Sequence, residues 1–142
     1  MAKLKFEIVT AERVVYLEEV DMVIAPGSQG ELGILPSHAP LLTTLKPGML
    51  MVRHDGEDVA MFVNGGFLEV MQDKVIVLAD VAERAEEIDV AKAEEAKRQA
   101  EESLRQSSAS AVDIAAAEAA LRRSLMQLKV AEHRRKKSNR PQ

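Results

Sequence analysis

The chain has 142 residues, a formal net charge of −4 and 46% hydrophobic residues, which fits one ordinary domain or a small domain with an appendage. It contains no Cys, which excludes disulfides, thiolate metal sites and Cys nucleophiles, and its 3% aromatic content gives little support for stacking on nucleic-acid bases. Apolar runs all fall short of the roughly 18 residues of a membrane span, and the polar start does not fit a secretory signal. We therefore expect a soluble protein of the cytoplasmic compartment.

Short apolar segments with a period of two fill the chain up to Arg84, as is typical of half-buried strands. Turn-forming pairs such as Asp55-Gly56 separate these segments. Several short strands joined by tight turns favour an antiparallel sandwich or barrel over residues 1–84. The predicted strands are residues 4–9, 20–27, 49–54, 58–63, 67–72 and 75–79.

Helical periodicity replaces the strand pattern from residue 89 onward. Asp89 is a suitable N-cap because its carboxylate can accept N–H groups of the first turn, and Asp113 is the corresponding candidate for a second helix. The turn-rich segment SSAS (107–110) lies between them. Residues 85–142 are therefore predicted to form an antiparallel hairpin of two helices, roughly 17 and 20 residues long. The predicted apolar positions are Val90, Ala93, Ala96 or Lys97, Ala100 and Leu104 on the first helix, and Ile114, Ala117, Leu121, Leu125 and Leu128 on the second.

Alanine dominates the facing positions of this hairpin. Burial of a Leu side chain stabilises by about 1.5–3 kcal/mol and burial of Ala by far less, so the hairpin should be held weakly. A mobile hairpin and a permanently docked one both fit this composition.

Charge is unevenly distributed along the chain. Residues 122–142 carry eight basic side chains and one acidic side chain, whereas the two preceding segments are acidic. Three interpretations stay open: a solvated tail that complements the helix dipole, a docking arm for an acidic protein surface, or a nucleic-acid-associated module. The negative overall charge and the lack of aromatic residues in the tail disfavour the third.

The segments that look like catalytic or cofactor-binding motifs do not match the known forms of those motifs. The glycines of PGSQGELG (26–33) match neither a dinucleotide fingerprint nor a P-loop, and the three His residues lack the spacing of a metal site. Ser37-His38 is not a nucleophile elbow, because it has no G-x-S-x-G pattern. Exposed Leu and Ile side chains beside Pro36 and Pro40 instead predict a stiff apolar docking loop. We therefore expect neither a catalytic site nor a metal site.

Four segments together resemble the epsilon subunit of bacterial-type F1Fo ATP synthases. They are GELGILPSHAPLLTTLKPG (30–48), VNGGFLEV (63–70), VIVLADVAERAEEID (75–89) and the Ala-rich helical pair that follows. The resemblance covers essentially the whole chain. It implies an N-terminal antiparallel β-sandwich that docks on the rotor and a C-terminal hairpin that regulates, in a non-catalytic subunit.

The resemblance also implies partners and sites. The sandwich would bind the gamma subunit and the c-ring at the cytoplasmic face of the energy-coupling membrane, without spanning it and without binding nucleic acid. The hairpin would fold on the sandwich or extend along gamma into the alpha and beta subunits, where it would block hydrolysis. The implied rotor interface is Glu31, Leu35, Pro36, His38 and Pro40, and the implied inhibitory basic arm is Arg122, Arg123, Arg134, Arg135 and Lys136.

Some members of the family bind ATP at the folded hairpin as a regulatory ligand that is not hydrolysed, and no other cofactor is implied. The matching positions here are Glu83, Ile88, Asp89, Lys92, Ala93 and Arg122. Lys92 replaces an Arg of the motif, and Met126 stands where a second-helix Arg is common. Because Lys lacks the planar fork that holds phosphate with two bonds, we expect weak or altered ATP binding.

Overall fold

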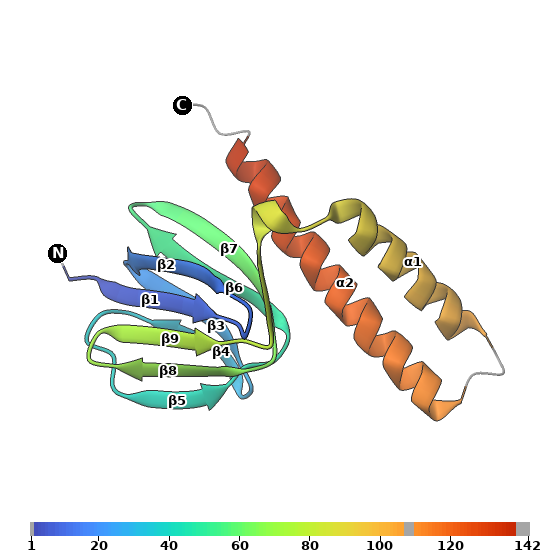
Figure 1. Ribbon diagram of the computed structural model, residues 1–142, viewed down its shortest axis with the longest axis horizontal. Coiled ribbons are helices and arrows are strands. Elements are labelled where there is room, and N and C mark those ends of the chain that lie inside the picture. The colour runs from blue at the N-terminus through green and yellow to red at the C-terminus, as the bar shows by residue number, and fades with distance from the viewer. Residues whose placement is uncertain (1, 107–109, 139–142) are drawn as a thin grey trace.

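The structure is a computed structural model that describes residues 2–106 and 110–138. A β-sandwich is followed by a helical hairpin that projects from one side of it, which confirms the predicted fold class (Figure 1). A short 3₁₀ helix, η1 (Ala85–Glu87), leads from the sandwich to the helices α1 (Val90–Arg105) and α2 (Ala111–Ser138). The strands are β1 (Leu4–Val9), β2 (Val14–Val20), β3 (Met22–Gly27), β4 (Gly30–Ile34), β5 (Leu41–Thr44), β6 (Gly48–His54), β7 (Glu57–Asn64), β8 (Phe67–Met71), β9 (Lys74–Leu78) and β10 (Val81–Arg84).

The strands form two sheets of five, in the orders β2-β1-β9-β8-β5 and β10-β7-β6-β3-β4. We call these the first sheet and the second sheet. Within the described residues, β1 and β9 pair in parallel and the other strand pairs are antiparallel. The predicted Asp55-Gly56 turn joins β6 to β7 and has positive φ at both residues, 51° and 82°, as a tight hairpin turn requires.

The main core lies between the two sheets. Leu4, Phe6 and Ile8 are fully buried, as their alternation in the sequence predicts, and they pack in one cluster with residues of both sheets, such as Leu50 and Val77. Among the residues that the structure describes, this cluster contains none from α1 or α2. The sandwich therefore buries its core without help from the hairpin.

All four strands that the sequence did not predict lie at sheet edges. They are β2 and β5 in the first sheet and β10 and β4 in the second. The predicted stiff loop around Pro36 and Pro40 is the short connection between β4 and β5. Ile34 at the end of β4 is fully buried, so the expectation of an exposed Ile there is wrong, whereas Leu35 is 57% exposed.

The hairpin begins as predicted, but its second helix differs. The Asp89 carboxylate accepts a hydrogen bond from the backbone N–H of Lys92 at 3.0 Å, which confirms Asp89 as the N-cap of α1. At α2 the Ser110 hydroxyl accepts a hydrogen bond from the backbone N–H of Asp113 at 3.1 Å, so Ser110 and not Asp113 is the N-cap of this helix. The helix is 28 residues long, longer than predicted. Residues 107–109 lie outside the described residues.

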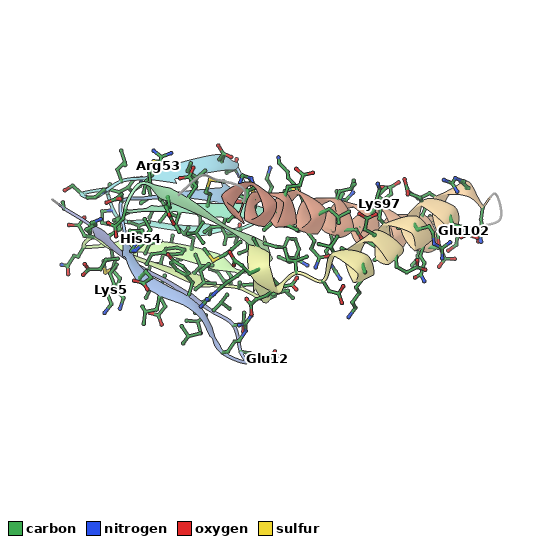
Figure 2. All side chains as sticks on the ribbon, turned by 90° about the horizontal axis from the view of Figure 1, so that it is seen from above. Lys5, Glu12, Arg53, His54, Lys97 and Glu102 are labelled. Carbon is green, nitrogen blue, oxygen red and sulfur yellow. The ribbon has the colours of Figure 1, made fainter. Side chains whose placement is uncertain are left out.

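A small apolar cluster joins α2 to the outer face of the second sheet. Val130 and Ala131 are buried against Phe62, Ala85 and Ile88. The helix α1 packs mainly on α2, and the hairpin extends away from the sandwich, as Figure 2 shows with Lys97 and Glu102 far from the strands. Of the predicted apolar positions on α2, Ala117 is buried but Ile114 and Leu125 are exposed. Leu125 lines an open pocket between α2 and the first half of α1.

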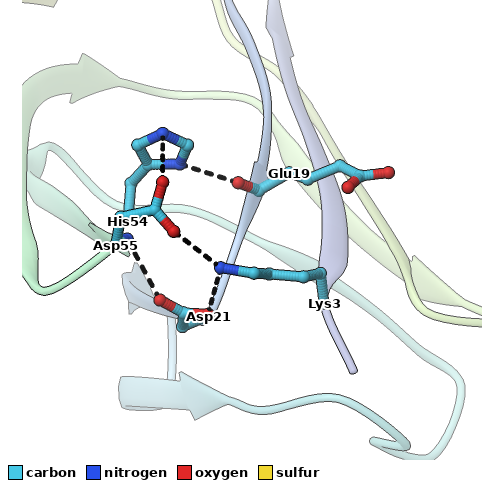
Figure 3. Close-up of polar contacts among 5 residues, drawn as sticks. All are labelled: Lys3, Glu19, Asp21, His54 and Asp55. Carbon is cyan, nitrogen blue, oxygen red and sulfur yellow. Dashed lines mark hydrogen bonds and ion pairs between the residues drawn. The ribbon is translucent and has the colours of Figure 1, made fainter. Parts of the chain in front are cut away.

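A polar network ties the N-terminal segment to two turns at one end of the sandwich (Figure 3). Lys3 Nζ lies 2.7 Å from an Asp21 carboxylate oxygen and 3.0 Å from one of Asp55. The hydrogen bond from Lys3 is the largest cause that lowers the pKa of Asp21, and the same contacts raise the pKa of Lys3. His54 extends the network through Asp55, at 3.3 Å.

A second set of contacts fixes η1 to β2 and the β1–β2 turn. The Arg84 side chain donates from Nε to the backbone carbonyl of Val15 at 2.7 Å, and its guanidinium lies over the Tyr16 ring. Glu87 accepts from the backbone N–H of Arg84 and pairs with Arg13 at 2.8 Å. The hydrogen bond from Arg13 is the largest cause that lowers the pKa of Glu87. The connection between the two domains is thus anchored to the sandwich.

We expect Glu87→Gln to lower the free energy of unfolding by about 0.2–1 kcal/mol at pH 7, because a partly exposed ion pair contributes about that much. The folded state lowers the pKa of Glu87, so the pair's contribution is fully present above the ordinary value of 4.5 and is lost as pH falls through the lowered pKa. Urea unfolding at pH 7 and pH 3 measures this, with Glu94→Gln as the control. A deficit of Glu87→Gln that stays the same at pH 3 would contradict it.

Candidate functional site

A pocket of about 380 Å³ lies where β10, α1 and α2 meet. The sandwich contributes side chains of β10 and β7 at the edge of the second sheet. The N-terminal half of α1 forms one wall of the pocket, and the middle of α2 forms the other. Its lining residues are Phe62, Val81, Glu83, Asp89, Lys92, Ala93, Ala96, Ala120, Arg123, Ser124 and Gln127. Four of the six residues that the sequence nominated for ATP binding, Glu83, Asp89, Lys92 and Ala93, are therefore brought together here.

Each nominated residue reaches the pocket for a local reason. Glu83 lies on β10, where its half-buried carboxylate accepts a hydrogen bond from Gln127 Nε2 at 2.7 Å. Asp89 is at the pocket because it caps α1, and Lys92 follows in the first turn. Ala93 is buried at the α1 wall of the pocket, where its small side chain takes up little space.

Two nominated positions lie elsewhere. Arg122 is exposed and is not among the lining residues, whereas Arg123 is. Successive residues of an α-helix are about 100° apart around its axis. Residues three or four apart, such as Ala120, Arg123 and Gln127, therefore lie on one face, and Arg122 lies outside that face. Ile88 is 3% exposed and packs in the apolar cluster beneath the hairpin.

The same rotation of α2 points Met126 away from the pocket. Its side chain packs against the apolar cluster on the second sheet and does not line the pocket. The residue that faces the pocket one turn after Arg123 is Gln127. No motif or spacing pointed to Gln127, because its place in the pocket depends on which side of α2 meets β10.

Charges in this pocket balance. Lys92 and Arg123 bring two cations, and Glu83 and Asp89 bring two carboxylates. The cations can hold an anionic group, while the carboxylates can accept from hydroxyl or amino groups of the same ligand. Because two carboxylates line the same space, a highly charged anion is attracted less than the cations alone would suggest.

The nominated rotor residues occupy two places. Leu35, Pro36, His38 and Pro40 belong to the β4–β5 connection, which is held to the β8–β9 turn by the bond from Ser37 N to Asp73 at 2.5 Å. Glu31 lies near the start of β4, beside the β3–β4 turn. That turn is bonded to the far end of β5, through Ser28 N and Thr44 O at 3.0 Å. Glu31 and His38 therefore lie toward opposite ends of the sandwich.

The His38 ring is engaged locally. Its Nδ1 lies 2.6 Å from the carbonyl oxygen of Ala39, and Ser37 adopts a left-handed backbone with φ of 70°. The His38 ring and the Ser37 backbone thus both take part in local loop contacts. In the part of the chain that the structure describes, no cluster of three His, Cys, Asp or Glu could hold a metal ion.

The outer face of the first sheet is exposed and is apolar toward one end, whereas the row at its other end carries the charged side chains of Glu19, Lys5 and Lys74. Phe67, Leu78, Val9 and Val14 lie side by side in one cross-strand row. In the next row, Glu7 and Glu69 alternate with apolar side chains. The large apolar residues that are more than half exposed on this face are Val14, Leu17, Leu42, Phe67, Met71 and Leu78. Such a contiguous patch is typical of an interaction surface.

The nominated basic arm lies on α2. Arg122 and Arg123 are exposed in its middle. Residues 134–136 belong to the same helix, but the side chains of Arg134, Arg135 and Lys136 lie outside the described residues. Among residues 2–106 and 110–138, the structure has no helix with both the length and the apolar character to cross a membrane.

Comparison with known proteins agrees with this architecture. Residues 3–85 match the family described as "ATP synthase, Delta/Epsilon chain, beta-sandwich domain", and residues 86–132 match "ATP synthase, Delta/Epsilon chain, long alpha-helix domain". The ATP synthase epsilon chain of Dehalococcoides mccartyi is 57% identical over 136 residues, covering 96% of this chain and 97% of that protein. That of Halorhodospira halophila is 46% identical over 142 residues, covering 99% and 100%.

Two solved structures share the fold. A chain of the Euglena gracilis mitochondrial ATP synthase superposes with a TM-score of 0.67 at 22% identity, covering 98% of this chain and 83% of its own length. A chain of the Tetrahymena thermophila mitochondrial ATP synthase gives 0.61 at 17% identity, covering 92% and 97%. With both family models matching in order along the sandwich and the hairpin, the chain belongs to the delta/epsilon family of ATP synthase subunits.

Proposed function

We propose that this epsilon-type subunit of the ATP synthase joins the gamma subunit to the c-ring through its sandwich and restrains ATP hydrolysis through its hairpin. The observation that carries the proposal is the way in which the hairpin is attached. Two helices are held on a self-sufficient sandwich by the small apolar cluster around Val130. Such an element can leave its site without unfolding the rest of the protein.

The energetics support a reversible attachment. Burial of Val130 stabilises by about 1.5–3 kcal/mol, and the buried Ala93 and Ala100 add much less each. Conformational equilibria of a few kcal/mol are the ones that a ligand or a partner surface can shift. The exposed cations of α2 would then meet acidic groups of the alpha and beta subunits once the hairpin extends.

The uncovered face of the first sheet supports docking of the sandwich on gamma. A row of four apolar side chains would be desolvated by a flat protein surface, and Glu7 and Glu69 in the next row would meet basic groups of that surface. The β4–β5 connection, with exposed Leu35 and Pro40, would meet the c-ring. The subunit would then be peripheral, at the cytoplasmic face of the energy-coupling membrane.

ATP would act as a weak regulatory ligand in the pocket between hairpin and sandwich, without being hydrolysed. The pocket presents Lys92 and Arg123 to phosphate groups, but Lys92 cannot form a bidentate pair and the two carboxylates oppose added negative charge. Catalysis would belong to other subunits of the complex. The nucleic-acid alternative finds no support in the family to which the chain belongs.

Removal of the hairpin tests the inhibitory role. A chain that ends at Asp89 keeps every strand, so we expect it to assemble with the catalytic complex and to raise ATP hydrolysis several-fold over the full chain. Steady-state hydrolysis by the two reconstituted complexes measures this. Equal rates at equal occupancy would show that the hairpin does not inhibit.

A charge on the outer face of the first sheet tests the docking surface. The binding partner in this test is the catalytic complex reconstituted without this chain. We expect Leu78→Glu to weaken binding to it by more than about thirtyfold, because loss of a central buried interface residue costs about 2 kcal/mol or more of binding free energy. Val112→Glu, an equal change at a 78% exposed position on α2, is the control. Equal affinities of the two variants, measured by biolayer interferometry, would refute this face as the docking surface.

Neighbouring arginines test the ATP site. We expect Arg123→Ala to abolish the weak ATP binding and Arg122→Ala to leave it unchanged, because only Arg123 lines the pocket. Lys92→Arg should raise the affinity about tenfold to a hundredfold through a second charge-assisted bond. Isothermal titration of the isolated chain measures all three variants. Tight ATP binding by the unaltered chain, or a loss caused by Arg122→Ala alone, would contradict the site.

A further inference from the structure

A polar contact closes one end of the mostly apolar interface between α2 and the sandwich. Gln127 Nε2 on α2 donates to the Glu83 carboxylate on β10 at 2.7 Å. Both side chains are half-buried, so the carboxylate has lost part of its hydration. A hydrogen bond to an ionised group is stronger than one between neutral groups, and breaking it leaves a partly desolvated charge.

This bond exists only while the hairpin is docked. Gln127 is carried by α2, three residues before Val130, which anchors the helix on Phe62. Glu83 is carried by β10, which is paired with β7 along its whole length. Neither side chain can follow the other when α2 leaves the second sheet, so the bond reports and stabilises one position of the hairpin.

We propose that Gln127 is a positioning residue whose amide holds the Glu83 carboxylate and latches the hairpin in the docked position without a bound ligand. The latch itself concerns the isolated chain. Its regulatory consequence rests on the proposed function: a nucleotide that uses Glu83 must first displace Gln127. The latch and the nucleotide then compete for one carboxylate, and ATP adds less to docking than a pocket with a free Glu83 would allow.

An exchange of the two groups separates a latch from mere packing. Gln127→Glu places two carboxylates together, Glu83→Gln leaves two amides, and the double variant Glu83→Gln/Gln127→Glu restores one amide and one carboxylate with their positions exchanged. All of these side chains are nearly equal in shape. Gln99→Glu is the matched control, because the Gln99 amide bonds Glu95 within α1, at 3.2 Å, and does not touch the sandwich.

The readout is the distance between hairpin and sandwich in the isolated full chain. Because the sequence has no Cys, spin labels on Glu102→Cys in α1 and Lys74→Cys in β9 report this distance alone. We expect Gln127→Glu to raise the ratio of undocked to docked chain by about tenfold or more, Glu83→Gln to raise it less, and the double variant to return most of the docked population. Gln99→Glu should not change it.

Two results would overturn the latch. One is an unchanged ratio in Gln127→Glu, and the other is a double variant that undocks at least as much as Gln127→Glu alone. Circular dichroism verifies that each variant is folded. Since no ATP synthase is present in this measurement, failure of the latch leaves the proposed inhibition untouched, and failure of the inhibition leaves the latch standing.

Discussion

The packing of Val130 and Ala131 of α2 against Phe62 of β7 is the contact on which the position of the whole hairpin depends. The helix α1 rests mainly on α2 and therefore goes where α2 goes. The sandwich core closes between its own two sheets, so releasing this contact costs the sandwich little. A few buried side chains thus hold two long helices in place, which is why we propose that a modest bias moves them.

The pocket also depends on the packing of Val130 and Ala131 against Phe62. Its walls come from β10, α1 and α2, so it is complete only when the hairpin is docked. A ligand that binds only this state stabilises it by about 2.7 kcal/mol at 100 times its Kd. The balanced charges of the pocket limit how far an anion can use this effect. The Gln127–Glu83 bond acts on the same equilibrium from within the chain, which makes docking less dependent on a ligand.

The sequence predicts the inner strands and misses the edges for a physical reason. An inner strand such as β1 is buried on its core face and paired on both sides, so its apolar residues must alternate. An edge strand has one neighbour, and the sequences of β2 (VVYLEEV) and β5 (LLTT) place apolar residues next to one another, without the alternation that marks a strand. The pocket shows the corresponding limit for helices. The family resemblance pointed to Arg122 and to the position of Met126, but the face of α2 that meets β10 carries Arg123 and Gln127. That rotation of α2 follows from the packing of the helix on the sandwich, which the sequence does not show.

The anchoring of η1 places the hinge of the hairpin. Arg84 is bonded to the carbonyl of Val15, and Glu87 pairs with Arg13, so η1 is tied to the first sheet through β2 and the β1–β2 turn. Ile88 comes next, in extended conformation, and Asp89 caps α1. Movement of the hairpin can therefore keep η1 and α1 intact and change the backbone at Ile88 and Asp89. In the proposed detachment, Ile88 would leave the cluster with Val130 and the pocket would open at Asp89, so that loss of the pocket and release of Gln127 would be one event.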